Sequence, residues 1–442
     1  MSNKLFFKGT LILTFTGLVS RLMGFFYRIF LSHTIGAQGV GIYQLTLPVH
    51  GIVLAAACMG IQAAISRLCA SSTALKKEKE ARSVLFLGIF LSVTLSSIFA
   101  LFVYLNASFI ACRLLKEPQT ALLLRILSFS FPLSSLHSCI NSFYYARKET
   151  GIPSLTQLLE QLARIGSTYV IYLILLSQGK EVSPMIAAGV ALFGEVTATA
   201  ASLLALGIDF SPGKDPTSHF FFSDLSYVYL KEITRIAVPH SVNRLLLTVL
   251  SGIEMVLIPQ QLLLTGINQS DALSIYGIFT GMALTLILFP ATVTNSASVM
   301  LMPSVASLQA LGYEKRIRYV IRQTLGSCFL FGAFCTLFFF ISGKFLGIFL
   351  FHSKTAGTYI KTLSFICPFL YSNTALESIL NGLGKPDTCL FHNAAGICIR
   401  IGFVLFCIPV LGIRGYFYGM LISQFLLTIL HFIYLNRMEL SD

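Results

Sequence analysis

The residues most able to do chemistry are arginines that lie inside a long apolar run near the N-terminus. Two of them share a stripe with small residues, at successive spacings of three and four: Thr14, Gly17, Arg21, Gly24 and Arg28. On an α-helix, this spacing puts all five residues on one face. An arginine that faces lipid at mid-membrane costs at least about 2.5–3.5 kcal/mol. The stripe is therefore predicted to face water, an anion or an acidic partner.

A second stripe of the same kind follows later in the chain: Ser241, Arg244, Thr248 and Ser251, with Glu254 three residues further on. A guanidinium stays charged, and its fork of donors matches the geometry of phosphate oxygens. We therefore predict that Arg21, Arg28 and Arg244 bind an anionic group. Glu254 is predicted to be a counter-charge to Arg21 or Arg28, or else a site for a proton or cation.

Within the apolar runs, positive charges outnumber negative ones. Seven arginines lie within or at the edges of these runs: Arg21, Arg28, Arg67, Arg125, Arg164, Arg244 and Arg400. The acids there are four glutamates: Glu160, Glu195, Glu254 and Glu377. Glu160 and Arg164 are four residues apart in the favoured order, which predicts either mutual neutralisation or a switchable site. The alternative for the other arginines is that they reach the membrane interface or pair with glutamates.

The composition indicates a polytopic membrane protein. Of 442 residues, 55% are hydrophobic and 11% are charged, whereas soluble domains carry about 25% charged residues. The formal net charge of +13 does not indicate nucleic-acid binding, because the basic residues fall in short loops between apolar runs. The ten cysteines include no C-x-x-C pair, and neither a metal site nor a cofactor is expected. No catalytic motif occurs, so the chain is not expected to be an enzyme.

Twelve apolar runs are long enough to cross a membrane. They cover 10–32, 40–68, 84–107, 120–146, 154–177, 183–206, 232–264, 272–302, 318–342, 357–382, 388–410 and 413–436. The predicted fold is therefore all-α, with about twelve transmembrane helices. Seventeen of the 31 Lys and Arg residues fall in loops on the side of the N-terminus and seven fall on the opposite side. By the positive-inside rule, both termini are predicted to be cytoplasmic.

The two halves of the chain resemble each other. Residues 60–71 align without gaps on residues 296–307, and at the same offset of 236 Arg164 falls on Arg400. We therefore predict two pseudo-symmetric six-helix bundles around a central cleft. The N-terminal bundle covers 1–207, a cytoplasmic linker covers 208–231, and the C-terminal bundle covers 232–442.

Several motifs in order along the chain resemble those of one known superfamily. They are SRLMGFFYR at 20–28, GAQGVGIYQ at 36–44, AISRL at 64–68, IPQQL at 258–262, IYGIFTGMA at 275–283, LFP at 288–290 and NGLGKP at 381–386. On these motifs the chain resembles the multidrug/oligosaccharidyl-lipid/polysaccharide flippase superfamily, in its polysaccharide-transport branch, which includes sporulation proteins. Members of that branch often have fourteen helices and an aspartate at the position of Glu254.

The resemblance implies a flippase that exports a lipid-linked saccharide, such as a peptidoglycan precursor, across a bacterial plasma membrane by alternating access. By similarity, the first-helix arginines bind the diphosphate, which maps onto Arg21 and Arg28. The partners are then the lipid-linked substrate and membrane lipids, and the oligomeric state stays open. The alternative is a cation- or proton-coupled multidrug antiporter of the same fold, in which Glu254 or Glu160 binds the coupling ion.

Overall fold

The computed structural model describes residues 3–147, 149–178, 184–209 and 225–437. Within these ranges the regular elements are helices, and no strand occurs. The all-α prediction is therefore confirmed. Most of the predicted linker at 208–231 lies outside the described residues.

Nine helices in the described part of the chain are long and apolar enough to cross a membrane, or up to ten when the bent pair α5–α6 counts as one span. The first covers 16–73 and has 58 residues. As one straight helix it would be about 87 Å long, which is more than twice the thickness of a bilayer core, about 30 Å. This stretch contains Gly36, whose φ of 69° and ψ of 176° are not helical. Because glycine adopts positive φ without strain, the chain breaks there, between the predicted runs 10–32 and 40–68.

By its internal packing the chain divides into two compact units. The N-terminal unit comprises 1–24 and 45–249, and the C-terminal unit comprises 25–44 and 250–442. The division therefore passes through two long helices, α1 (Asn3–Leu54) and α9 (Leu225–Leu263). The predicted domain boundaries and the central cleft stay predictions.

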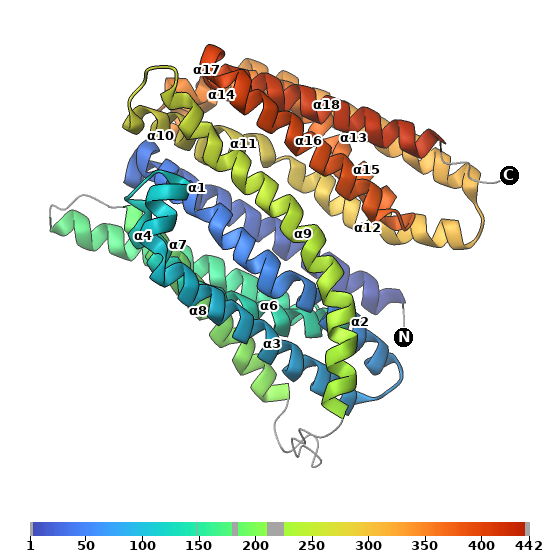
Figure 1. The fold of residues 1–442 in the computed structure, drawn as a ribbon. Coiled ribbons are helices and arrows are strands. Elements are labelled where there is room, and N and C mark those ends of the chain that lie inside the picture. Colours follow the sequence, from blue (N-terminus) through green and yellow to red (C-terminus); the bar gives the residue numbers. More distant parts are fainter. Residues whose placement is uncertain (1–2, 148, 179–183, 210–224, 438–442) are drawn as a thin grey trace. The chain divides into compact units, whose positions relative to one another are not determined.

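The N-terminal unit consists of helices that run alongside one another, with α3, α6, α7 and α8 adjacent (Figure 1). Besides its parts of α1 and α9, it contains η1 (Ala55–Met59), α2 (Gly60–Ala74), α3 (Glu78–Leu105), α4 (Ala107–Phe109), η2 (Ile110–Leu115), α5 (Thr120–Ser128), α6 (Ser130–Ala146), α7 (Gly151–Ser177) and α8 (Pro184–Asp209). Its core includes Ile65, Leu85 and Phe143, all fully buried. Burial of such side chains stabilises the unit by about 1.5–3 kcal/mol each.

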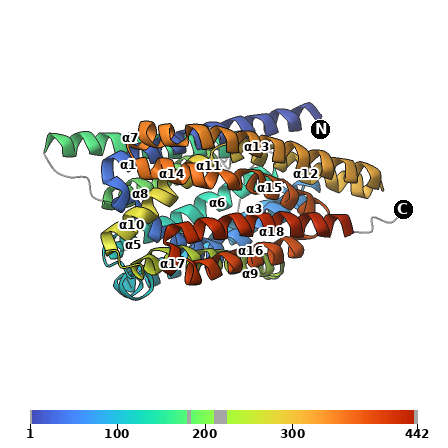
Figure 2. The ribbon, with the colours of Figure 1, turned by 90° about the horizontal axis from the view of Figure 1, so that it is seen from above.

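The C-terminal unit contains α10 (Gln269–Gly277), η3 (Ile278–Ala283), α11 (Leu284–Leu288), α12 (Ala291–Ala310), α13 (Glu314–Phe351), α14 (Lys354–Leu363), η4 (Ser364–Ile366), α15 (Cys367–Gly382), α16 (Pro386–Phe406), α17 (Ile408–Leu411) and α18 (Ile413–Arg437). Helices α16 and α18 pack side by side (Figure 2). Side-chain caps begin two helices: Asn268 accepts from the backbone N–H of Asp271, and Ser353 accepts from that of Ala356. Each cap satisfies a donor that the first helical turn leaves unpaired.

The helix boundaries follow the internal repeat found in the sequence. At the offset of 236, the end of α2 at Ala74 falls on the end of α12 at Ala310, and the start of α3 at Glu78 falls on the start of α13 at Glu314. The end of α6 falls in the same way on the end of α15. The two units therefore repeat the positions of these helix boundaries as well as parts of their sequence.

Candidate functional site

The arginines of the two predicted stripes are exposed. Arg21 on α1 and Arg244 on α9 belong to the N-terminal unit, and within the described residues neither guanidinium has a hydrogen-bond or ion-pair partner. Arg28 lies on α1 in the C-terminal unit, where its Nη1 donates to the Thr285 hydroxyl at 3.0 Å. The guanidinium groups of Arg21 and Arg244 thus lie at the surface of their unit, available to an anion, whereas that of Arg28 is exposed but engaged.

Helix α1 is held to its neighbours on either side of the division at Gly24. In the N-terminal unit, the Thr16 hydroxyl donates to that of Ser154 on α7 at 3.0 Å. In the C-terminal unit, the rings of Phe25 and Phe289 pack with their centroids 5.0 Å apart. These contacts fix the parts of α1 that carry Arg21 and Arg28.

Glu254 lies in a buried, fully engaged cluster of the C-terminal unit. Its side chain is 5% exposed, and the Arg400 guanidinium clamps it with two bonds, Nε to Oε1 at 2.6 Å and Nη2 to Oε2 at 3.0 Å. The Tyr416 hydroxyl donates to Oε1 at 2.7 Å. The partner of Glu254 is therefore Arg400, whereas the sequence suggested Arg21 or Arg28. The cluster is neutral, because one carboxylate meets one guanidinium.

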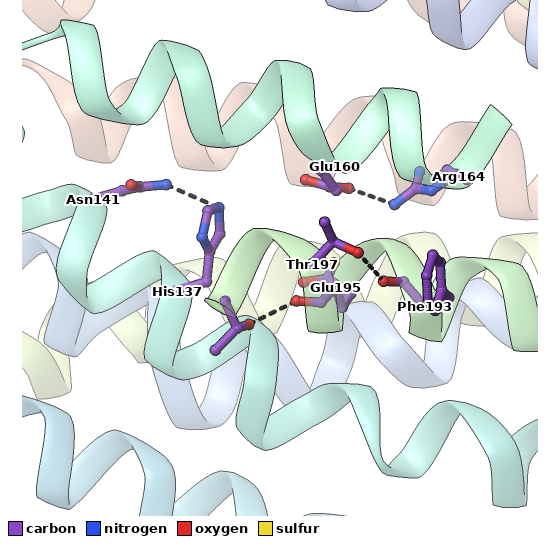
Figure 3. A network of polar contacts seen from close by, with 8 residues as sticks. His137, Asn141, Glu160, Arg164, Phe193, Glu195 and Thr197 are labelled. Carbon is purple, nitrogen blue, oxygen red and sulfur yellow. Dashed lines mark hydrogen bonds and ion pairs between the residues drawn. The ribbon is translucent and has the colours of Figure 1, made fainter. Parts of the chain in front are cut away.

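A second polar cluster lies in the N-terminal unit, between α6, α7 and α8 (Figure 3). Arg164 and Glu160 form an ion pair one turn apart on α7, as their spacing predicts. Glu195 on α8 is half-buried and interacts electrostatically with both of them. A Cβ on the neighbouring Gly194 would lie 3.3 Å from the Arg164 Nε atom, so α8 approaches α7 closely at this level.

Hydrogen bonds hold His137 as a neutral imidazole on α6. The Asn141 amide donates to its Nε2 at 2.9 Å, so that nitrogen carries no proton. Its Nδ1 lies 2.7 Å from the Ser202 hydroxyl, which itself donates to the carbonyl of Ala198. Nδ1 is therefore the donor in its bond to Ser202.

The sequence did not predict that Arg400 and Tyr416 are the partners of Glu254, or that Glu195 lies in the cluster with Glu160 and Arg164. Arg400 is 146 residues from Glu254, and a tyrosine such as Tyr416 has no local signal that marks it as a donor. Glu195 was identified as an intramembrane acid, but its proximity to Arg164 depends on the packing of α8 on α7. Among the described residues, no group of three or more His, Cys, Asp or Glu side chains is placed to hold a metal ion.

Comparison with known proteins finds a matching family model and several similar proteins. The family model described as polysaccharide biosynthesis protein matches residues 6–309. The chain is 26% identical to stage V sporulation protein B of Bacillus subtilis, over 98% of this chain and 83% of that protein. It is 22% identical to the lipid II flippase MurJ of the same organism, over 91% of this chain and 77% of that protein.

Solved structures show the same fold. An inward-facing multidrug resistance transporter of the MATE family, in the MOP superfamily, matches with a TM-score of 0.76 and 16% identity, over 96% of this chain and 94% of that one. A MOP superfamily transporter from Pyrococcus furiosus matches with a TM-score of 0.68 and 16% identity, over 99% and 96%. The apolar helices and these matches identify a multi-pass membrane protein.

Proposed function

The chain belongs to the polysaccharide biosynthesis protein family, and from this premise we propose that it is a flippase for a lipid-linked oligosaccharide or cell-wall precursor. One relative is named as a lipid II flippase and another as a sporulation protein. The observation that supports an anionic substrate is that the exposed, unpartnered charges of the two stripes are positive, whereas their buried acid is already neutralised. Arg21 and Arg244 are exposed and have no partner among the described residues, whereas the carboxylate of Glu254 is buried and engaged by Arg400.

The proposed binding groups are Arg21, Arg28 and Arg244, which hold the diphosphate of the substrate while its lipid tail stays in the bilayer. Each guanidinium forms charge-assisted hydrogen bonds with phosphate oxygens and keeps its charge at any physiological pH. Thr285 orients Arg28 through its hydroxyl without neutralising it. Alternating exposure of these residues to the two sides of the membrane then moves the headgroup without covalent chemistry, so no enzymatic step is proposed.

The proposed setting is a bacterial plasma membrane with both termini in the cytoplasm. The excess of Lys and Arg in the loops on the side of the N-terminus supports this orientation. The partners are the lipid-linked saccharide and the surrounding lipids.

The test uses purified protein in vesicles with fluorescent lipid II as the probe, and measures how fast the probe becomes accessible to a membrane-impermeant quencher. At probe concentrations below saturation, we expect Arg21→Ala and Arg244→Ala to slow flipping at least about tenfold through weaker binding, because a hydrogen bond to a charged group contributes about 1.5–3 kcal/mol.

Arg235→Ala is the matched control. Arg235 is exposed on the same helix as Arg244 but nine residues away, which is about 180° around the helix axis. Normal flipping by the Arg21 and Arg244 variants, at normal expression, would disprove the binding role. If the protein instead exports cationic dyes and moves no lipid II, the antiporter alternative with Glu254 or Glu160 as the coupling site replaces the flippase.

A further inference from the structure

Two histidines face each other in the C-terminal unit, and the proposed flipping does not use them. His33 lies on α1, and His352 ends α13, two residues before α14 begins at Lys354. Their Nδ1 atoms are 3.1 Å apart, and their ring centroids are 4.6 Å apart with the ring planes at 72°. Both residues are exposed, so dissolved ions reach the pair.

A backbone carbonyl fixes the orientation and the tautomer of His33. Its Nε2 lies 2.8 Å from the carbonyl oxygen of Leu350, and because that oxygen only accepts, Nε2 carries the proton and donates. In the neutral ring, Nδ1 then holds a lone pair directed at His352. A histidine that binds a metal almost always donates its other nitrogen in this way to a carbonyl or a carboxylate.

Buried packing beneath the pair holds both backbones in place. Phe351 and Ala356 are buried, and Ile29 packs against them. Ile29 is one helical turn before His33, and Phe351 directly precedes His352. His352 itself has a φ of 49°, a left-handed conformation in which histidine is enriched relative to most side chains. The two rings are therefore brought together by the fold of the unit.

We propose that His33 and His352 form a binding site for a divalent transition metal such as Zn²⁺. Two nitrogens bonded to a tetrahedral zinc ion at about 2.0–2.1 Å lie about 3.3–3.4 Å apart, so the two rings need to part by only about 0.2–0.3 Å. Water occupies the two remaining positions around the metal.

Metal binding needs only the movement of one proton. Without metal, Nδ1–H of His352 donates to Nδ1 of His33. On binding, water carries that proton to Nε2 of His352, which has no partner among the described residues. Both rings stay neutral, and the lone pairs of both Nδ1 atoms bond to the metal.

The donor set decides the class of metal and the strength of binding. Imidazole nitrogen suits Zn²⁺, Ni²⁺ and Cu²⁺, whereas Mg²⁺ and Ca²⁺ prefer oxygen ligands, which the two rings do not offer. A structural zinc site has four protein ligands, and two of them supply roughly half of its binding free energy. The expected Kd for zinc is therefore about 1–200 µM.

The bound metal would tie α1 to the turn between α13 and α14. By the predicted topology this end of the unit faces away from the cytoplasm, because His33 follows the run 10–32 and His352 precedes the run 357–382. Arg28 is five residues before His33 on the same helix. The metal site stands apart from the proposed function, since its occupancy is measured without any lipid substrate.

The first experiment titrates ZnCl₂ into the purified full-length protein, free of any affinity tag, by isothermal titration calorimetry. We expect a site in the wild type that binds zinc at least about tenfold more tightly than in His33→Gln or His352→Asn, because each variant loses one of two ligands. Glutamine keeps a donor for the carbonyl of Leu350, and asparagine tolerates the positive φ of position 352.

His240→Ala is the matched control, because His240 is an exposed histidine on α9, outside the pair. It should bind zinc as the wild type does, and MgCl₂ should not bind to the site. Equal zinc affinity in the wild type and the two pair variants overturns the proposal, as does a wild type that binds no zinc at about 1 mM.

The second experiment needs no variant. One equivalent of Cu²⁺ is added to the wild type, and pulsed electron paramagnetic resonance counts the imidazole nitrogens bound to the copper. Two coupled imidazoles support the site, and competition by excess ZnCl₂ should remove their signal. A signal from one imidazole or from none overturns it.

Discussion

Replacing Glu254 with glutamine should destabilise the protein more than any exposed charge substitution. The change keeps the side-chain shape and an acceptor for Tyr416 but leaves the Arg400 guanidinium buried without a counter-charge. Removing one partner of a buried pair costs about 3–5 kcal/mol. For a unit of roughly 200 residues, each kcal/mol lowers the melting temperature by about 2–4 °C, so the expected fall is about 6–20 °C. Thermal unfolding of the detergent-solubilised protein measures it.

The double variant Glu254→Gln with Arg400→Gln separates pairing from mere loss of contacts. Because both charges are then absent, the double variant should be more stable than the sum of the two single changes indicates. The control is Glu149→Gln, whose exposed pair with Arg147 contributes about 0–1 kcal/mol. Strictly additive single and double changes, or a loss under about 1 kcal/mol in Glu254→Gln, would refute the account of the buried pair.

Further variants test the same two clusters by thermal unfolding. Tyr416→Phe removes a donor to a carboxylate and should cost about 1.5–3 kcal/mol, and an unchanged melting temperature would contradict the 2.7 Å bond. Gly194→Val crowds Arg164 where α8 packs on α7 and should cost about 1–3 kcal/mol, whereas Gly194→Ala should cost less because a single methyl group, 3.3 Å from the Arg164 Nε atom, requires only a small shift of that side chain. His137→Phe leaves the Asn141 amide N–H without its acceptor and should cost about 1–3 kcal/mol, and the double variant with Asn141→Leu should recover part of that loss.

The helices were predictable because the bilayer requires a span of about 20 apolar residues, a property of local sequence. The break at Gly36 falls between two predicted runs, where a glycine can take a backbone conformation that other residues avoid. The broken span at α5–α6, bent by 41°, was counted as one run because its apolar residues continue through the bend. Hydrophobicity locates a span, but the angle within it depends on packing.

The polar contacts were predictable only where they are local. Glu160 and Arg164 lie one turn apart, so helix geometry alone brings them together. Glu254 and Arg400 meet because α9 packs near α16, and no spacing in the sequence encodes that contact. The same limit applies to Arg28 and Thr285, which are 257 residues apart.

The two units differ in where the glutamate that pairs with the repeated arginine comes from. At the offset of 236, Arg164 corresponds to Arg400, and each arginine is engaged by a glutamate. The position that corresponds to Glu254 is Leu18, so α1 supplies no acid where α9 supplies one. In the N-terminal unit the acid comes instead from the same helix as the arginine.

This difference bears on which long helix is freer to move. A pair within α7 moves with that helix, whereas the two bonds from Arg400 to Glu254 tie α16 to α9. The bond that joins α1 to α7 at Thr16 and Ser154 is between neutral hydroxyls and is weaker. Movement of α9 at Glu254 must therefore carry α16 along or break a buried ion pair, while α1 can separate from α7 at lower cost. We expect faster amide exchange in residues 16–24 than in residues 250–258, and the reverse order would show that the ion pair does not restrain α9.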